Sequence, residues 1–217
     1  MRKCSLLLLI AVIVFSALCF TGCDRSYNEN EVLSSARELL ERSKTLNEIY
    51  YGEGIAYIED ESKREGSYYQ ADAYSLSKYG ISTLEDIKNL TRSVFTTEYS
   101  NILISTKLSS VIDDTSIASF ARYYQKKSSL DGSDECIMVY KDAAVFLKDT
   151  VTYDYESMTV SDVDGEIIYV TLNVTVTNPE NQTQSSTLTV GLIEEEDGFR
   201  IDTPTYKSYI KDDYREK

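Results

Sequence analysis

The chain has 217 residues, with 36 Asp and Glu against 22 Lys and Arg, and its formal net charge is -14. Phosphates repel so acidic a chain, which excludes nucleic acid as a default partner. The chain contains no His, which excludes Ser-His-Asp catalysis, Cys-His catalysis and zinc sites built on imidazole. These properties favour a non-enzymatic protein, and we expect neither a cofactor nor a metal site.

The first segment has the pattern of an export signal. Arg2 and Lys3 precede an apolar run from about Leu6 to Phe20, after which the sequence becomes polar. A basic start, an apolar run and small residues before a cut site are typical of secretory signals. Thr21-Gly22-Cys23 resembles the small-small-Cys box of bacterial lipoproteins. This resemblance implies cleavage before Cys23 and acylation of its thiol. The alternative is an uncleaved signal anchor, because about 17 apolar residues lie at the lower edge of a spanning length.

The cleaved form determines the organisation that we predict. Residues 1–22 form the signal peptide, 23–30 a lipidated tether, and 31–217 a single domain, because no linker divides the chain. Two acyl chains anchor a protein stably, so the membrane is the first partner and the domain lies at its extracytoplasmic face. Without Cys4, Cys19 and the acylated cysteine, only Cys136 remains. The domain therefore depends on its core rather than on disulfides.

Helical periodicity begins at Glu31. Apolar residues recur there at steps of three and four, which predicts an amphipathic helix that ends at Gly52 and Gly54. The apolar positions are Val32, Ala36, Leu39, Leu40, Leu46 and Ile49.

Residues 50–79 contain seven of the 18 tyrosines. Alternation predicts two short strands here, separated by a charged turn at 59–66. Strand tyrosines commonly bury the ring and leave the hydroxyl to a polar group. The alternative is a face that stacks on carbohydrate or binds a peptide, with Tyr68 and Tyr69 as candidate partner-binding residues.

Two further helices follow. Ser82-Thr83-Leu84-Glu85 has the pattern of a capping box, which predicts a helix over about 84–95. Thr96 or Thr97 is positioned to cap a third helix, and helical character continues to about residue 112.

The remainder is rich in Val, Ile, Thr and Tyr and is typical of strands. Gly-containing and Asn-Pro turns between alternating segments predict antiparallel hairpins. Cys136 lies in one of these strands and is interpreted as a small apolar residue in the interior. The predicted strands are 119–128, 135–141, 144–160 with a break, 166–178, 185–195 and 198–202.

This order of elements predicts an α+β domain in which N-terminal helices pack on a curved antiparallel sheet, similar to the cystatin-like or NTF2-like class. Residues 162–166 echo the first half of a calcium loop, but Thr171 stands where the final Glu is needed, so we interpret them as a hairpin turn. Two acidic turn tips are candidate partner-binding sites. They comprise Asp131, Asp134 and Glu135, and Glu194, Glu195, Glu196 and Asp197.

Three segments carry a resemblance to a known family: Tyr50-Tyr51-Gly52, Phe95-Thr96-Thr97-Glu98-Tyr99 and Gly198-Phe199-Arg200-Ile201. Together with the order of elements, they resemble the Gram-positive IseA family. The resemblance implies a cystatin-like fold and inhibition of cell-wall DL-endopeptidases of the NlpC/P60 type. The lipid box departs from that family, because it tethers the protein to the membrane. The alternative function is a small-ligand or glycan-binding module that uses the concave face of the sheet and the 50–79 region.

Overall fold

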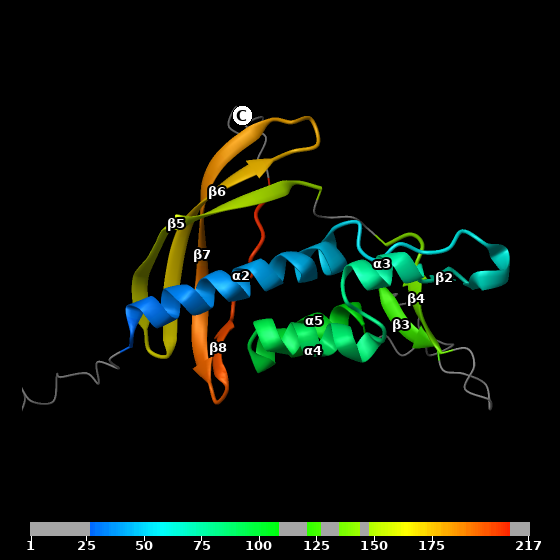
Figure 1. Cartoon of the computed structure of the whole chain (residues 1–217), viewed down its shortest axis with the longest axis horizontal. Helices are drawn as coiled ribbons and strands as arrows, with labels where there is room; N and C mark the ends of the chain where they lie inside the picture. The colour runs from blue at the N-terminus through cyan, green and yellow to red at the C-terminus, as the bar shows by residue number, and fades with distance from the viewer. Residues whose placement is uncertain (1–26, 109–120, 127–134, 144–147, 209–217) are drawn as a thin grey trace, which may run out of the picture.

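The computed structural model describes residues 27–108, 121–126, 135–143 and 148–208. The predicted signal peptide, Cys23, Asp131 and Asp134 lie outside these ranges. Within them the chain forms helices α2 to α5, a short 3-10 helix (Glu61–Lys63) and two antiparallel sheets of four strands each. The helices come mostly before the strands, which confirms the predicted α+β class (Figure 1).

Helix α2 (Glu29–Tyr51) runs through the middle of the molecule, with one sheet near each of its ends (Figure 1). All six predicted apolar positions are buried. The helix ends as expected at Gly52, whose N–H donates to the carbonyls of Asn47 and Glu48. Its start differs from the prediction, because Glu29 and Asn30 are helical and do not belong to an extended tether.

Helices α4 (Leu84–Val94) and α5 (Thr97–Lys107) form the predicted pair. The capping box lies one residue later than expected. The Thr83 hydroxyl accepts from the Asp86 N–H, and the Asp86 carboxylate accepts from the Thr83 N–H. Asp serves at the third helical position because it too reaches back to the cap. The prediction of a strand around Ala73 was wrong, because these residues begin the short helix α3 (Ala73–Lys78). The Asp72 side chain caps this helix by accepting from the Ser75 N–H.

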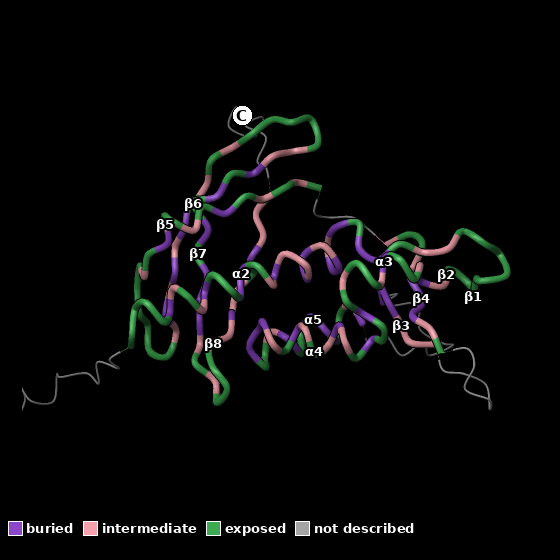
Figure 2. Tube along the Cα trace, viewed as in Figure 1, coloured by how far each residue is buried: buried purple, intermediate pink, exposed green. Residues whose placement is uncertain are grey.

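Four consecutive strands form the larger sheet in the order β5-β6-β7-β8. They are β5 (Thr150–Asp164), β6 (Ile167–Thr177), β7 (Thr183–Glu195) and β8 (Gly198–Ile201). The predicted alternation is confirmed, since Ile168, Val170, Leu172, Val174 and Val176 are all buried. Figure 2 shows buried positions along the body of the sheet and exposed residues at the hairpin ends.

A β-bulge bends strand β5. Its register against β6 shifts between Asp154 and Thr159, although the strand continues from Thr150 to Asp164. The sequence predicted a break within 144–160 but did not place it. The Ser157 hydroxyl donates to the Asp154 carbonyl and accepts from the Asn173 N–H at 2.8 Å. A side chain thus supplies the acceptor that the distorted ladder lacks at this point.

The second sheet was not predicted as a separate sheet. Its order is β1-β2-β4-β3, and it combines β1 (Arg64–Glu65) and β2 (Tyr68–Gln70) with β3 (Tyr123–Lys126) and β4 (Cys136–Tyr140). Alternation predicted β2, β3 and β4 individually, whereas β1 lies in the segment 59–66 that was predicted as a turn. Alternation also carries no information about pairing between segments so far apart in the chain.

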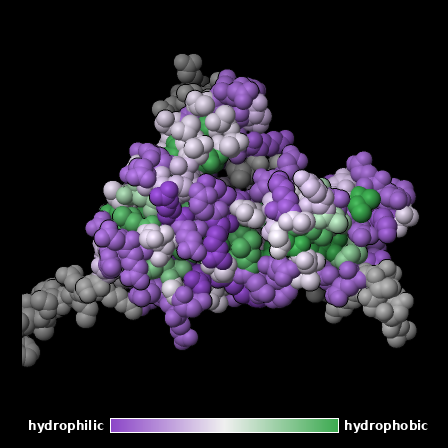
Figure 3. All heavy atoms as spheres, in the orientation of Figure 1, coloured by the Kyte–Doolittle hydropathy of each residue, from purple (hydrophilic) through white to green (hydrophobic). Residues whose placement is uncertain are grey.

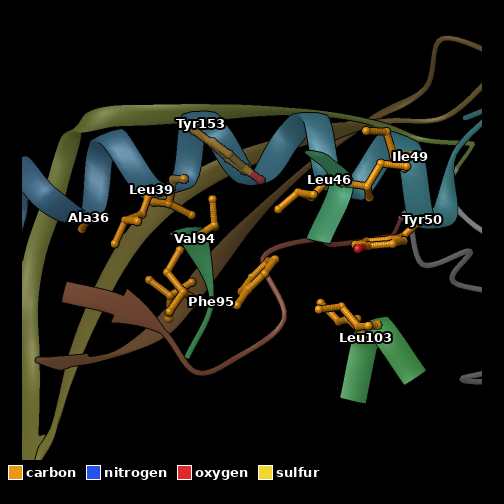
Figure 4. Close-up of a cluster of buried hydrophobic side chains, with 14 of the residues drawn as sticks. Ala36, Leu39, Leu46, Ile49, Tyr50, Val94, Phe95, Leu103 and Tyr153 are labelled. Carbon is orange, nitrogen blue, oxygen red and sulfur yellow. The ribbon is translucent and has the colours of Figure 1, made fainter. Parts of the chain in front are cut away.

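The core lies between α2, α4 and the inner face of the larger sheet. Leu39, Val94, Phe95 and Tyr153 come from different elements and meet there (Figure 4). Phe95 and Ile201 form a parallel bridge, so the connection between α4 and α5 is attached to strand β8. The inner face of the sheet is therefore largely covered by apolar side chains. A cavity of ≈ 240 Å³ lies between α2 and β5, with Lys44, Asn47 and Tyr153 in its lining. No helix among the described residues is long and apolar enough to span a bilayer.

Candidate functional site

In the predicted acidic tip at the β7–β8 hairpin, two of the four carboxylates form hydrogen bonds with other residues of the protein. Glu195 accepts through Oε1 from the Thr97 N–H at 3.0 Å, at the beginning of α5. Asp197 accepts from Arg200, whose Nε donates to the Arg92 carbonyl at the end of α4. These contacts attach the hairpin to both helices. An acidic group near a helix N-terminus is stabilising, because it faces the positive end of the helix dipole.

Glu194, Glu196 and Asp197 of this tip are all exposed. Asp197 forms an ion pair with Arg200, so among the described residues Glu194 and Glu196 are the exposed carboxylates of the tip without an ion pair. The turn closes with Gly198 at φ +118°, a conformation that glycine adopts without the strain of a Cβ. The hairpin projects at the lower edge of the molecule, and its surface there is hydrophilic (Figure 3). The fold therefore presents two carboxylates on a rigid support.

Two other acidic segments lie beside this hairpin. The N-terminal turn of α2 carries Glu29 and Glu31, and the β5–β6 hairpin carries Asp162, Asp164 and Glu166. Residues of all three segments line one small cavity, with Glu31, Glu166 and Glu194 among them. None of the segments 27–33, 162–168 and 194–198 contains Lys or Arg. We call this surface the acidic end; it consists of Glu29, Glu31, Asp162, Asp164, Glu166, Glu194 and Glu196.

The cavity within the acidic end is too small for a typical organic ligand. Its volume is ≈ 130 Å³, whereas pockets for drug-sized molecules measure about 300–1,000 Å³. Tyr27 and Val163 are partly exposed beside it, at 39% and 42%. An anionic surface with a little apolar area suits contact with another macromolecule.

Glu135, the residue of the second predicted acidic tip that the structure describes, lies far from the first tip. Glu135 lies exposed next to β4, at the other end of the molecule from the β7–β8 hairpin (Figure 1). It lines a cavity of ≈ 360 Å³ together with Lys63, Arg64 and Lys126. Its surroundings are therefore basic as well as acidic. Glu135 therefore does not form one anionic site with the β7–β8 tip.

Tyr68 and Tyr69 are a correction to the predicted partner-binding surface. Their exposed fractions are only 3% and 5%. The Tyr68 hydroxyl donates to the Ala121 carbonyl at 2.8 Å, and the Tyr69 hydroxyl donates to Glu61 at 3.0 Å. Both tyrosines belong to strand β2, which lies between β1 and β4 in the second sheet. Their buried rings therefore stabilise the sheet and are not exposed to a partner.

Buried polar groups in the same region also have structural partners. Arg122 is 7% exposed, and its guanidinium donates to the carbonyls of Tyr50, Gly52 and Glu53. The Tyr123 hydroxyl accepts from Ile55 and donates to the Ile49 carbonyl. Together they satisfy carbonyls at the end of α2, where a cation also complements the helix dipole. Sequence patterns did not predict this arrangement, because it joins segments about 70 residues apart.

Cys136 lies at the first position of β4 and is half-buried, so it is less enclosed than predicted. Its thiol contacts the Met138 sulfur at 3.7 Å. Within the described ranges, no group of three or more Cys, Asp or Glu is arranged to hold a metal ion.

Comparisons with known proteins give no relative. No protein-family model matches the chain, and no curated protein matches it significantly. The resemblance to the IseA family therefore remains a prediction.

Proposed function

We propose that this chain is a lipid-anchored, extracytoplasmic binding protein whose acidic end docks on a basic surface of another envelope protein. The observation that carries this proposal is the β7–β8 hairpin, on which Glu194 and Glu196 stay exposed while Glu195 and Arg200 attach it to α5 and α4. Preorganised groups lose little conformational freedom on binding, which favours affinity.

The partner we propose is a peptidoglycan DL-endopeptidase of the NlpC/P60 type, the class that the resemblance to the IseA family implies. The mechanism is occlusion. The acidic end approaches a substrate cleft, and the partly exposed Tyr27 and Val163 supply apolar contact area. Charge complementarity mainly accelerates association and selects the partner, so the inhibition depends on ionic strength.

The anchor restricts where such a target works. Tyr27 follows Cys23 by four residues, which span at most about 14 Å when fully extended. Tyr27 also lines the cavity of the acidic end. Acylation of Cys23 therefore holds the acidic end close to the bilayer surface, where we expect the target to act. Anionic headgroups repel the same surface, so it faces a protein rather than the lipid.

The experiment measures inhibition of a purified NlpC/P60-type endopeptidase by the full-length chain in detergent. The variant Glu194→Gln/Glu196→Gln removes two charges from the acidic end. The control Glu59→Gln/Glu180→Gln removes two exposed charges elsewhere. Loss of one rim charge typically costs up to about 1 kcal/mol, so we expect about tenfold weaker inhibition for the first variant and no change for the control.

Two results would contradict the proposal. One is the absence of inhibition by the unmodified chain at equimolar enzyme. The other is equal inhibition by both double variants at low salt, where charge effects are largest.

A further inference from the structure

The outer face of the larger sheet carries an ordered array of hydroxyl groups that the acidic end does not explain. On this face Thr171, Thr175 and Thr177 of β6 stand directly opposite Thr189, Ser185 and Thr183 of β7. Helix α2 packs on the opposite, apolar face of the sheet (Figure 1).

Strand β5 extends the same rows. Thr150, Thr152 and Thr159 pair with Thr177, Thr175 and Thr171 in turn. The remaining row is Asp154, Asn173 and Thr187. The result is an array of three strands and four rows, which we call the threonine grid. Strand and residue spacings give it dimensions of about 10 Å by 20 Å.

The threonine grid is almost free of charge on a strongly acidic chain. Asp154 is its single carboxylate, and it contains no Lys or Arg. Ten of the twelve residues are exposed, and only Thr171 and Thr177 are half-buried. Among the described residues, the Thr175 and Thr187 hydroxyls have no hydrogen-bond partner within the chain. They are free to donate to and accept from a ligand.

An aromatic ring flanks the grid. Beyond the Thr171–Thr189 pair, Tyr169 stands opposite Gly191. A Cβ at Gly191 would lie 3.6 Å from the Tyr169 ring and 3.0 Å from Ile167. Glycine at this position avoids crowding against Ile167, and the Tyr169 ring lies at ordinary contact distance from it. A ring beside hydroxyl donors and acceptors is a combination that suits sugars, because a sugar presents both apolar ring faces and hydroxyls.

We propose that the threonine grid is a docking surface for a neutral polysaccharide. A protein partner would require large apolar or Arg anchors, which the grid lacks. A membrane would require Lys and Arg or an apolar face, which it also lacks. A neutral polymer with regularly repeated hydroxyls suits the threonine grid, because the grid is nearly uncharged and its own hydroxyls repeat at regular spacing. This surface is separate from the acidic end and does not depend on the proposed inhibition.

The experiment passes the full-length chain in detergent over columns of chitin and of cellulose, with retention as the measurement. We expect retention of the unmodified chain. The variant Thr175→Val/Thr187→Val removes two hydroxyls while keeping shape and strand propensity, and we expect about tenfold weaker binding from two lost hydrogen bonds. The control Thr106→Val changes an exposed threonine on α5 and leaves retention unchanged.

A conservative variant separates binding from folding. Thr175→Ser/Thr187→Ser keeps both hydroxyls, so it retains binding if the hydroxyls are the recognised groups. The proposal is overturned if the unmodified chain passes through both columns, if the valine variant is retained equally, or if the chain binds only anionic vesicles. Glu194→Gln/Glu196→Gln keeps polysaccharide binding, which distinguishes this surface from the acidic end.

Discussion

The two sheets of this protein differ in how their strands come together. Strands β5 to β8 follow one another through tight turns, and each pairs with its neighbour in sequence. The smaller sheet instead places β2 beside β4, pairing Tyr68 with Tyr140 across 72 positions of the chain. The first sheet relies on an alternating apolar face, whereas buried polar side chains such as Arg122 and Tyr123 fix the second to α2. The difference shows that local pairing needs only a hydrophobic pattern, while distant pairing here uses specific hydrogen bonds.

Removal of the Arg122 guanidinium tests this comparison most strongly. Arg122→Met removes the donor to three carbonyls at the end of α2 and directly after it, of Tyr50, Gly52 and Glu53. Each unsatisfied group costs about 1–3 kcal/mol, so we expect the free energy of unfolding to fall by about 4 kcal/mol. Urea denaturation followed by circular dichroism measures it.

The control for this prediction is Arg64→Met in the same sheet. Arg64 is exposed and pairs with Glu61, and a surface pair contributes about 1 kcal/mol at most. Equal effects of the two arginine variants would show that hydrogen bonding by Arg122 does not hold the second sheet.

Truncating a buried leucine of the larger sheet creates a cavity. We expect this change to lower the free energy of unfolding slightly less than Arg122→Met does. Leu172 is 1% exposed, and Leu172→Ala should lower the free energy of unfolding by about 3 kcal/mol, the usual cost of such a truncation. The outward neighbour Thr171 provides the control, since Thr171→Ala removes little buried area. The same denaturation experiment compares them, and a larger loss at Thr171 would contradict the assignment of the inner face.

The smallest expected effect concerns pH at the edge of the second sheet. Hydrogen bonds from Arg64 and then Tyr69 hold the pKa of Glu61 below its ordinary 4.5. Because the folded state favours the carboxylate, this stabilisation is present above the unfolded-state pKa and is lost as pH falls through the folded value. The protection of β1 and β2 amides, which is their exchange rate compared with the intrinsic rate at the same pH, should therefore decrease in acid.

The matched variant for this prediction is Glu61→Gln, which cannot titrate. We expect its amide exchange in β1 and β2 to lack the additional acid dependence. An unmodified chain whose β1–β2 protection is the same on both sides of that transition would contradict the role of Glu61.

The sequence predicted much of the fold but little of the candidate sites. Helical spacing located α2, and alternation located the inner face of β6, because both patterns arise within one element. The same patterns could not show that Tyr68 and Tyr69 are covered by neighbouring strands. Nor could they show that Glu195 faces the start of α5, 98 residues away.

The amino-acid sequence alone determined the α+β class, the hairpin turns and which face of each long strand is apolar, because local periodicity encodes them. Only the tertiary structure decided that there are two sheets, which carboxylates of the β7–β8 hairpin stay exposed, and that threonines of three strands align in one array. Those features depend on strand register and on contacts between distant segments, and neither is set by the spacing of residues within one element.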